Sequence, residues 1–393
     1  MHILTFTSLF PNGRQPVHGL FVRNRMEAFA RKYGHRWTVA APVPWFPRLP
    51  FKVKELYHAY ARVPRLETDR GYPVHHPRYL VTPGLGMRFY GDWMARGAAA
   101  CVRRIHREHP IDVIDAHYAY PDGTAACRLG RELGVPVVLS ARGTDLNVFT
   151  RMPAIAPLIR RNLEQARRVI CVSSALARIA GENGADPARV SVIGNGIDPA
   201  LFRPRPRDAA RAALGLPPEG NLILSVGHLV ELKGFHLLLE AFARLEDKTC
   251  LLAVAGEGPE RPRLEALAGR LGVSGRVRLP GAVRQEGLAD WYAAADVFAL
   301  MSSREGWPNV VTEAQAMGLP VIATRVGAME DLIPDPALGT LLAERSAAAL
   351  EPALRGALAR DWDRKTIAAA GARRTWDAAA DRLQELFAAI ARE

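Results

Sequence analysis

The sequence is poor in cysteine and lacks both long apolar runs and a recognisable leader. Its four cysteines are scattered over 393 residues without the close spacing of zinc sites or redox pairs, so we expect them to be small core residues. No apolar run approaches the roughly 18 to 20 residues that span a bilayer. The opening stretch has neither a basic start nor a small-residue cleavage site, which favours a first strand over a secretion signal. We therefore expect a cytoplasmic protein, with any membrane contact peripheral and at the inner face.

Lysine is also scarce, because only six of the 52 cationic residues are lysine and the others are arginine. The net charge of +12 favours a polyanion, which could be nucleic acid, an anionic bilayer or a diphosphate substrate. Zinc-finger spacing, a basic leucine zipper and Gly-Phe-rich motifs are all missing, so we expect no nucleic-acid partner. A non-catalytic polyanion-binding protein stays open as an alternative.

The length and the hydrophobic pattern predict two α/β domains. A chain of 393 residues with 49% apolar residues exceeds the size of one ordinary core. Short apolar runs alternate with amphipathic segments, which is typical of βαβ units and parallel sheets. In the first half we expect strands at 2–7, 37–41, 112–116, 136–140, 168–172 and 190–193, and helices at 19–33, 90–108, 122–134 and 174–184.

A Pro-rich stretch, 199–218, interrupts the alternation, which then begins again. We expect strands at 221–226, 250–255, 276–279, 296–300 and 320–323, and helices at 233–245, 259–271, 285–294 and 309–317. The predicted domains are therefore 1–198 and 199–375, each Rossmann-like and doubly wound. The tail 376–393 is predicted to be a helix that packs across the domain junction.

Open parallel sheets bind ligands beyond the carboxyl ends of their strands, so the loops there are the places to search. The most informative stretch is 296–324, in which a strand leads to Glu305, then to Pro308, then to a helix that contains Glu313. Proline suits a helix start, where free backbone amides can hold an anion such as a diphosphate. Two glutamates eight residues apart would, on spacing alone, be solvated surface charges.

The residues around these glutamates favour a functional interpretation instead. The strings S-x-x-E-G-x-P-N-V and E-A-x-A-x-G-x-P-V-I-A-T resemble the Glu-x7-Glu signature of family-4 retaining glycosyltransferases. The resemblance extends over most of the chain and is strongest at 221–331. It implies a GT-B fold, in which two α/β domains face each other across a cleft and a C-terminal helix crosses back. It also implies a UDP- or GDP-linked sugar donor in the second domain, with no resident cofactor.

The resemblance also implies roles for individual residues of the second domain. Glu305 would bind the hydroxyls of the donor sugar, and Glu313 those of the nucleotide ribose. Lys233 would grip the diphosphate, whereas His228 stands where the family usually has arginine and would give less charge. The loop and helix start would add further donor contacts from Gly306, Trp307, Pro308, Asn309, Val310 and Val311.

Further candidates follow other predicted strands. Gly256 and Glu257 lie in a G-x-G-P turn beside the base in the family, and this turn lacks the third glycine of a dinucleotide fingerprint, which argues against an NAD-dependent oxidoreductase. In the first domain Gly19 is a close-approach glycine between the first strand and the first helix, although an ordinary loop glycine is an equal alternative. The family places a histidine near the donor sugar at the position of His117, and its H-G-x-D loop corresponds to one that begins at Arg142 and contains Asp145.

The predicted reaction is hexosyl transfer with retention, in which Glu305, His117 and Lys233 are the catalytic candidates. No D-x-D motif follows a strand, since the one instance, 361–363, lies in a surface stretch, so we expect no catalytic metal. A GT-B sugar-nucleotide epimerase is an alternative that would release no new glycoside.

The acceptor is predicted from the charge pattern of the first domain. Aromatic and basic residues at 45–62 and arginines 151, 160, 161, 167 and 168 suit an anionic membrane, although an ordinary basic surface is an equal alternative. A membrane contact would fit a lipid-linked or envelope-polysaccharide acceptor.

Overall fold

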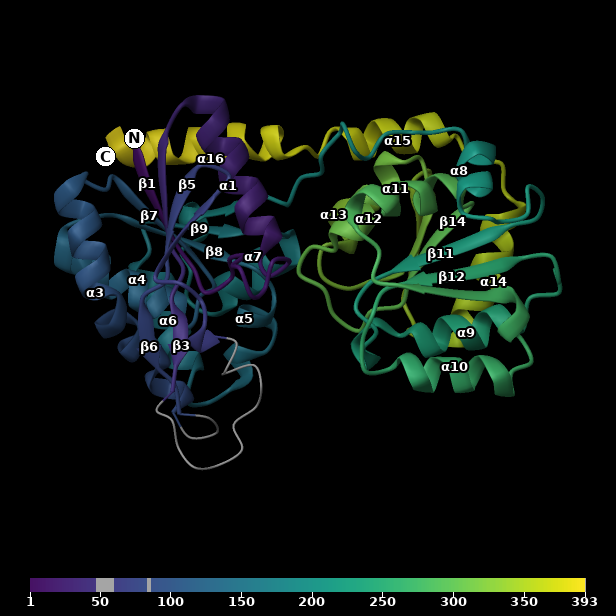
Figure 1. The fold of residues 1–393 in the computed structure, drawn as a ribbon, viewed down its shortest axis with the longest axis horizontal. Helices are drawn as coiled ribbons and strands as arrows, with labels where there is room; N and C mark the ends of the chain where they lie inside the picture. The colour runs from purple at the N-terminus through teal and green to yellow at the C-terminus, as the bar shows by residue number, and fades with distance from the viewer. Residues whose placement is uncertain (47–59, 83–85, 393) are drawn as a thin grey trace. The chain divides into compact units, whose positions relative to one another are not determined.

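A computed structural model describes residues 1–46, 60–82 and 86–392 (Figure 1). The chain forms two compact units, of which unit 1 comprises 1–195 with 376–393 and unit 2 comprises 196–375. The C-terminal segment therefore belongs to unit 1, whereas its predicted packing across the domain junction stays a prediction. Most of the predicted segment 45–62 lies outside the described residues.

Unit 1 contains an eight-stranded sheet in the order β10-β9-β8-β7-β1-β2-β5-β4. All of its neighbouring strands are parallel except β4 and β5, which form an antiparallel pair at one edge. The strands are β1 (His2–Phe6), β2 (Arg36–Ala40), β4 (Leu66–Asp69), β5 (Tyr72–His75), β7 (Val113–His117), β8 (Val137–Ala141), β9 (Arg168–Cys171) and β10 (Val190–Val192). Two further short strands, β3 (Val43–Trp45) and β6 (Arg78–Leu80), pair with each other.

The helices of unit 1 cover both faces of this sheet. They are α1 (Leu20–Tyr33), α3 (Tyr90–Glu108), α4 (Asp122–Leu133), α5 (Thr144–Asn147), α6 (Ala156–Gln165), α7 (Ser174–Glu182) and α16 (Trp376–Arg392). Helix α16 lies along α1 (Figure 1), and their apolar faces pack with Ile3, Val113 and Ile170 of the sheet in one buried cluster. The last segment of the chain thus completes the core of the first unit.

Unit 2 contains a six-stranded, wholly parallel sheet in the order β13-β12-β11-β14-β15-β16. The strands are β11 (Leu222–Val226), β12 (Leu251–Ala255), β13 (Val277–Gly281), β14 (Val297–Leu300), β15 (Val321–Thr324) and β16 (Gly339–Leu342). The helices are α8 (Arg207–Ala213), α9 (Phe235–Ala243), α10 (Arg261–Arg270), α11 (Gln285–Ala294), α12 (Asn309–Ala316), α13 (Met329–Leu332), α14 (Ala347–Ala359) and α15 (Arg364–Ala372).

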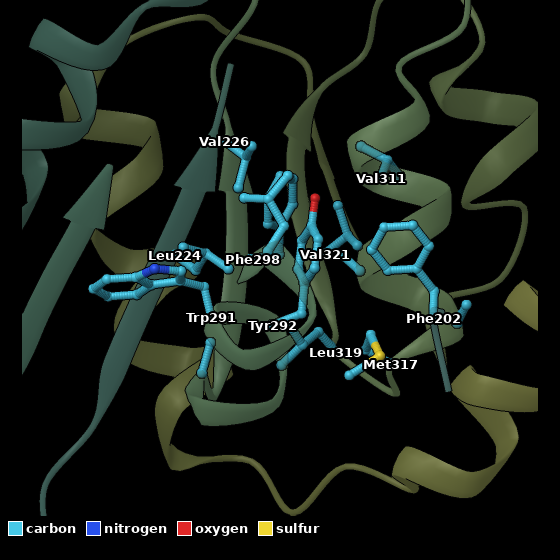
Figure 2. Packing of buried hydrophobic residues seen from close by; sticks show 14 of the residues in the cluster. Phe202, Leu224, Val226, Trp291, Tyr292, Phe298, Val311, Met317, Leu319 and Val321 are labelled. Carbon is cyan, nitrogen blue, oxygen red and sulfur yellow. The ribbon is translucent and has the colours of Figure 1, made fainter. Parts of the chain in front are cut away.

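The central strands of this second sheet, β11, β12, β14 and β15, are largely apolar because both of their faces are covered. Successive strand residues point to opposite faces, so Leu224 and Phe298 join one buried cluster whereas Ile223 and Val297 join another. Figure 2 shows the first cluster, in which Tyr292 of α11 and Val311 of α12 pack over the sheet. The helices α11 and α12 are therefore fixed on the sheet by burial of apolar surface.

No helix in the described parts of the chain combines the length and the apolar character needed to cross a bilayer. Three of the four cysteines, Cys127, Cys171 and Cys250, are buried, and Cys101 is half-buried. All four are free thiols, in line with the prediction that they are core residues.

Truncation of Phe387 tests whether α16 is part of the core of unit 1. This ring is fully buried and packs edge-to-face on Phe29 of α1, with 5.3 Å between the ring centroids. We expect Phe387→Ala to lower the free energy of unfolding by about 3–5 kcal/mol, measured by urea titration. The exposed neighbour Glu385 provides the control, since Glu385→Ala should change it by no more than about 0.5 kcal/mol. A loss below about 1 kcal/mol for Phe387→Ala would contradict this role of the helix.

Candidate active site

The order of strands in unit 2 defines a ligand-binding edge. The connections run outward in opposite directions from β11 and β14, and such a switch point opens a crevice beyond the carboxyl ends of the two strands. Lys233 follows β11 in a short 3-10 turn, Glu231–Lys233, and Glu305 lies in the loop after β14. The sheet topology therefore brings these two predicted residues to the same edge.

Lys233 and Glu305 form an ion pair at this edge. The Lys233 Nζ donates to Glu305 Oε1 at 2.6 Å, and the hydroxyl of Ser302 donates to the same oxygen at 2.6 Å. The two side chains are only 18% and 11% exposed. The alternative that Glu305 is a solvated surface charge is therefore wrong. Its second oxygen, Oε2, accepts no hydrogen bond from the described residues and can receive a ligand hydroxyl.

The loops that carry this pair are held together by backbone contacts. A Cβ added to Gly234 would lie 2.3 Å from the carbonyl oxygen of Met301, so only glycine allows the two loops to approach. The amide of Ser303 donates to the carbonyl of Leu232 at 2.9 Å. Arg345, which follows β16, donates from Nε to the carbonyl of Met301 at 2.8 Å. Arg345 thus supports the site, although nothing in the sequence indicated it.

Helix α12 begins directly after the Glu305 loop. Pro308 is its N-cap residue in an extended conformation, and no side chain caps the helix. The amide of Val311 donates to the carbonyl of Pro308 at 3.0 Å. A Cβ added to Gly327 would lie 2.1 Å from the carbonyl oxygen of Glu305, so the loop after β15 packs directly against the Glu305 loop. Trp307 packs partly buried against the apolar cluster, and its indole N–H has no partner among the described residues.

Glu313 lies on the buried side of α12 and is 5% exposed. The hydroxyl of Tyr292 donates to Glu313 Oε2 at 2.9 Å. Burial raises the pKa of Glu313 to about 7, an effect that the Tyr292 hydrogen bond partly opposes. Glu313 is therefore not a solvated surface charge either.

Glycines in the loops after β11 and β12 allow these loops to pack tightly. A Cβ added to Gly256 would lie 1.8 Å from the carbonyl oxygen of Gly227, and one added to Gly258 would lie 2.4 Å from that of Leu229. The amide of Leu229 donates to the carbonyl of Glu257 at 2.8 Å. The requirement for glycine at position 256 therefore comes from the protein's own backbone.

The two charged candidates of these loops are open to solvent. The carboxylate of Glu257 is 53% exposed and pairs with Arg261 at 3.0 Å, one helical turn away. His228 is exposed. The predicted contacts of Glu257 with a base and of His228 with phosphate stay predictions.

Unit 1 has a corresponding switch point, between β1 and β7, and His117 ends β7 there. Its Nε2 bonds Asp115 Oδ2 at 2.7 Å, and its Nδ1 accepts from the Nε of Arg142 at 3.0 Å. The ring is fully buried, and burial lowers its pKa to about 4, helped by Arg142 and opposed by Asp115. His117 is therefore neutral at pH 7, with Nε2–H donating to Asp115, and both ring nitrogens are engaged.

Two buried arginines complete this cluster. Arg142 donates from Nη1 to Asn195 at 3.1 Å and lies over the ring of Phe21. Arg25 is fully buried and donates from Nη2 to Ser140 at 3.2 Å, while its Nε and Nη1 have no partner among the described residues. Burial lowers the pKa of both guanidinium groups.

The carboxyl group of Asp115 faces these cations. Burial opposes its ionisation, but His117, Arg25 and Arg142 outweigh this effect and lower its pKa to about 2. The cluster therefore keeps a carboxylate out of water by surrounding it with donors.

The other predicted residues of unit 1 organise loops. Asp145 is fully buried and accepts from the amides of Ala119 at 2.9 Å, Arg142 at 3.1 Å and Gly143 at 2.8 Å. Gly19 has φ of 70°, and a Cβ there would lie 2.2 Å from the carbonyl oxygen of Leu9. The structure thus gives each residue a local role, while their contact with a substrate stays a prediction.

Sequence reasoning missed a further buried carboxyl group in unit 1. Asp122, at the start of α4, is fully buried and accepts from the hydroxyl of Ser8 at 3.0 Å and also from the Ser8 amide. Burial raises its pKa to about 7. Asp122 therefore fixes the loop that follows β1.

The described residues contain no cluster of three His, Cys, Asp or Glu side chains placed to hold a metal ion. The D-x-D stretch lies between α14 and α15, where the Asp363 carboxylate accepts from the amides of Lys365 and Thr366. Asp363 is thus a helix cap.

The buried His117–Asp115 pair predicts a dependence of stability on pH. Since the folded-state pKa of His117, about 4, lies below its ordinary value of 6.5, the unfolded chain binds more protons between these values. The contribution of His117 to stability is therefore lost as the pH falls from 6.5 to 4, by on the order of 3 kcal/mol. The raised pKa values of Asp122 and Glu313 act in the opposite sense, so the contribution of His117 is isolated by comparison with a variant that lacks it. Asp115 adds a further loss between pH 3.8 and about 2.

Urea titrations at pH 7 and pH 4.5 test this account. We expect the unfolding free energy at pH 4.5 minus that at pH 7 to be more positive in His117→Gln than in the unaltered protein, because the variant lacks the loss that His117 contributes. The control variant is His109→Gln, at an exposed histidine. It should change the free energy of unfolding at pH 7 by no more than about 0.5 kcal/mol. An equal loss on acidification in His117→Gln and in the unaltered protein would refute the assignment.

Comparisons with known proteins identify the family of the chain. Residues 206–374 match the family model described as glycosyl transferases group 1, and residues 21–201 match the model described as glycosyltransferase family 4. The TuaC protein of Bacillus subtilis, described as a candidate glycosyltransferase of teichuronic acid biosynthesis, is 31% identical over 335 residues, which cover 84% of this chain and 83% of TuaC. The alternatives of an epimerase and a polyanion-binding module find no support in these matches.

Solved structures show the same fold. Sucrose-phosphate synthase from Thermosynechococcus elongatus superposes with a TM-score of 0.77 at 21% identity and 99% coverage of both chains. The HepE protein of Anabaena, solved with UDP, superposes with a TM-score of 0.75 at 20% identity over 99% of this chain and all of the other. The fold is GT-B, and the chain belongs to the group 1 glycosyltransferases and is itself a glycosyltransferase.

Proposed function

We propose that this glycosyltransferase takes a hexose from a UDP- or GDP-linked donor bound by unit 2 and transfers it with retention of the anomeric configuration. The observation that carries the proposal is the Lys233–Glu305 pair, largely removed from water beside the uncapped start of α12. A diphosphate placed there would meet both an ammonium group and helix amides. The complex of the HepE neighbour with UDP supports this choice of ligand.

Each group of unit 2 then has a defined task. Lys233 has two N–H donors beyond its bond to Glu305, and they stabilise the negative charge that develops on the leaving diphosphate. Glu305 Oε2 accepts from a hydroxyl of the donor sugar, while Glu313 accepts from the ribose. Gly306, Trp307 and residues 309–311 at the start of α12 line the sugar and phosphate.

The proposed reaction needs no metal ion, because Lys233 and the helix amides supply the positive charge. The acceptor hydroxyl attacks the anomeric carbon from the face that the diphosphate leaves. A leaving phosphate oxygen takes the hydroxyl proton, so the bond to the diphosphate breaks as the new glycosidic bond forms. The protein contributes position and electrostatic stabilisation.

The residues of unit 1 take a supporting role in this proposal. Since both nitrogens of His117 are engaged, the histidine orients the guanidinium of Arg142 and does not transfer a proton itself. Asp145 holds the loop that carries Arg142. Gly19 allows the loop after β1 to approach the ligand.

Replacement of Glu305 tests the proposed donor site. We expect Glu305→Gln to lower kcat/KM at least 100-fold with the nucleotide sugar that the enzyme uses, because it removes the charge that orients the sugar and holds Lys233. A panel of UDP- and GDP-sugars identifies that donor, and NMR of the product should show the anomeric configuration of the donor. The exposed Glu344 provides the control substitution, Glu344→Gln, which should keep full activity. Undiminished turnover in Glu305→Gln would refute the role of Glu305.

The acceptor in this proposal is lipid-linked or an envelope polysaccharide, reached at the inner face of an anionic membrane. The support is a group of exposed arginines at the end of the 3-10 turn Phe149–Arg151 and on α6, namely Arg151, Arg160 and Arg161. Trp45, which precedes the undescribed residues 47–59, is 48% exposed. The similarity to TuaC, whose description refers to teichuronic acid biosynthesis, also favours a role in polysaccharide biosynthesis.

Liposome sedimentation tests the membrane contact. At low salt the protein should bind vesicles that contain phosphatidylglycerol and should not bind vesicles of phosphatidylcholine alone. The triple variant Arg151→Gln/Arg160→Gln/Arg161→Gln should bind at least tenfold more weakly, since each basic residue near the surface contributes about 1 kcal/mol. Equal loss in a control of the same charge, Arg244→Gln/Arg270→Gln/Arg278→Gln in unit 2, would argue for non-specific attraction alone.

A further inference from the structure

The carboxylate of Glu313 is held by a tyrosine from a neighbouring helix. Glu313 lies on α12, eight residues beyond Glu305, and is 5% exposed. Tyr292 lies near the end of α11 and is fully buried. Its hydroxyl donates to Glu313 Oε2 at 2.9 Å. This hydrogen bond is separate from the Lys233–Glu305 pair, and the resemblance to the family did not indicate it.

The ring of Tyr292 is fixed by aromatic packing on two sides. It packs edge-to-face on Phe202, with 5.9 Å between centroids and an interplanar angle of 77°, and at 5.9 Å and 45° on Phe298 of β14. Figure 2 shows its hydroxyl at the end of the ring that lies away from Met317 and Leu319. Packing of this kind leaves the ring no room to turn, so the hydroxyl has a fixed position.

The hydroxyl of Tyr292 is a permanent donor. Burial and the neighbouring carboxylate of Glu313 raise its pKa well above the usual value. The Tyr292 hydroxyl therefore keeps its proton throughout the pH range in which folded proteins are usually studied. A buried hydroxyl and a buried carboxylate each satisfy the other, which removes the cost of leaving either one unpaired.

One oxygen of Glu313 is left for a ligand. Tyr292 occupies Oε2, and Oε1 accepts no hydrogen bond from the described residues. A carboxylate held at one oxygen cannot rotate freely, so the direction of the other oxygen is also set. Ribose carries two adjacent hydroxyl donors, and this ligand suits a single fixed acceptor.

We propose that Tyr292 is a positioning residue for nucleotide binding, which holds Glu313 Oε2 so that Oε1 meets the ribose hydroxyls of the donor. This inference rests on the proposed function, because it takes the nucleotide to be the ligand of the α12 edge. Tyr292 itself touches no substrate and acts through Glu313.

The charged groups on the elements that pack around Glu313 are paired with other residues or exposed to solvent. Tyr292 is therefore the group that interacts with Glu313. On α11, Asp290 is paired with Arg205 at 2.9 Å, and Glu286 is exposed. On α15 and just beyond it, Arg364 donates to the carbonyl of Ala295, Lys365 is exposed, and Arg374 donates to Gln315 Oε1 at 3.0 Å. Strand β15 carries no charged residue. The pKa of Glu313, about 7, is set by burial, which raises it, and by the Tyr292 hydroxyl, which lowers it.

This arrangement predicts a pH dependence that identifies the role of Tyr292. An ionised carboxylate accepts a hydroxyl hydrogen bond more strongly than a protonated one, so nucleotide affinity should rise as the pH increases through about 7. In Tyr292→Phe the ring and its packing remain, but the donor is lost. The pKa of Glu313 then rises further, and the increase in affinity moves to higher pH.

Calorimetry between pH 5.5 and 9 with UDP, and with GDP if UDP does not bind, tests the inference. At pH 7 Tyr292→Phe should bind about 5- to 10-fold more weakly than the unaltered protein, with its pH midpoint shifted upward. The loss should disappear with 2′,3′-dideoxyuridine diphosphate (or its guanosine counterpart), which has no ribose hydroxyls. The matched control is Tyr33→Phe, because Tyr33 donates to the carboxylate of Asp381 at 2.6 Å in unit 1. That variant should bind UDP like the unaltered protein.

Three outcomes decide the matter. Equal affinity and an equal pH midpoint in Tyr292→Phe and the unaltered protein would overturn the inference, and so would a loss that persists with the dideoxy nucleotide. If the unaltered protein bound neither UDP nor GDP, the proposed function would fail first. Glu313→Gln gives an independent check should Tyr292→Phe not fold, since it should flatten the pH profile and leave the affinity for the dideoxy nucleotide unchanged.

Discussion

The ion pair between Lys233 and Glu305 is the contact on which the proposed donor site depends. Each residue follows a different strand of the second sheet, and neither charge would be stable so far from water without the other. The pair joins the turn after β11 to the loop after β14, and that loop leads directly into α12. Glycines 234 and 327 allow the surrounding backbone to close on it. The position of the helix start, and hence of Glu313, follows from this contact.

The two units handle buried charge in different ways. In unit 1 the His117 cluster is wholly buried, and most of its donors and acceptors are used within the protein. In unit 2 the Lys233–Glu305 pair is partly exposed, and Oε2 of Glu305 accepts no hydrogen bond from the described residues. A cluster of the first kind fixes the shape of a loop, whereas one of the second kind is ready to accept a ligand. This contrast is why the proposed donor site is assigned to unit 2.

Much of the fold could be predicted from the sequence because most strands are buried on both faces. Strands such as β12, β14 and β15 are continuous apolar runs, and the predicted ranges agree with the observed ones within a residue or two. The sequences of β4 and β5, LETD and YPVH, carry too little apolar character to be recognised, and their antiparallel pairing departs from the predicted parallel sheet. Helix α14 was missed as well, since Pro352 interrupts its pattern.

The site was only partly predictable, because several of its contacts join residues that lie far apart in the sequence. Lys233 and Glu305 each follow a recognisable strand, so the sequence alone indicates that they share one edge of the sheet. Tyr292 gives no signal in the sequence, because its partner lies 21 residues away on another helix. Arg345 follows β16, which was not predicted at all. The engagement of both nitrogens of His117 depends on Asp115 of the same strand and on Arg142 in the loop after β8.

Helix α16 comes from the C-terminal segment but packs in unit 1, which has a consequence for folding during synthesis. During synthesis, residues 1–195 leave the ribosome long before 376–392, yet they need that last helix to cover the apolar face of α1. Unit 2, which is continuous in sequence, can fold while the nascent first unit still exposes Phe29 and its neighbours. A chain that terminates before residue 376 would therefore carry a complete unit 2 and an incomplete unit 1, so the core of unit 1 forms only after the rest of the molecule has been synthesised.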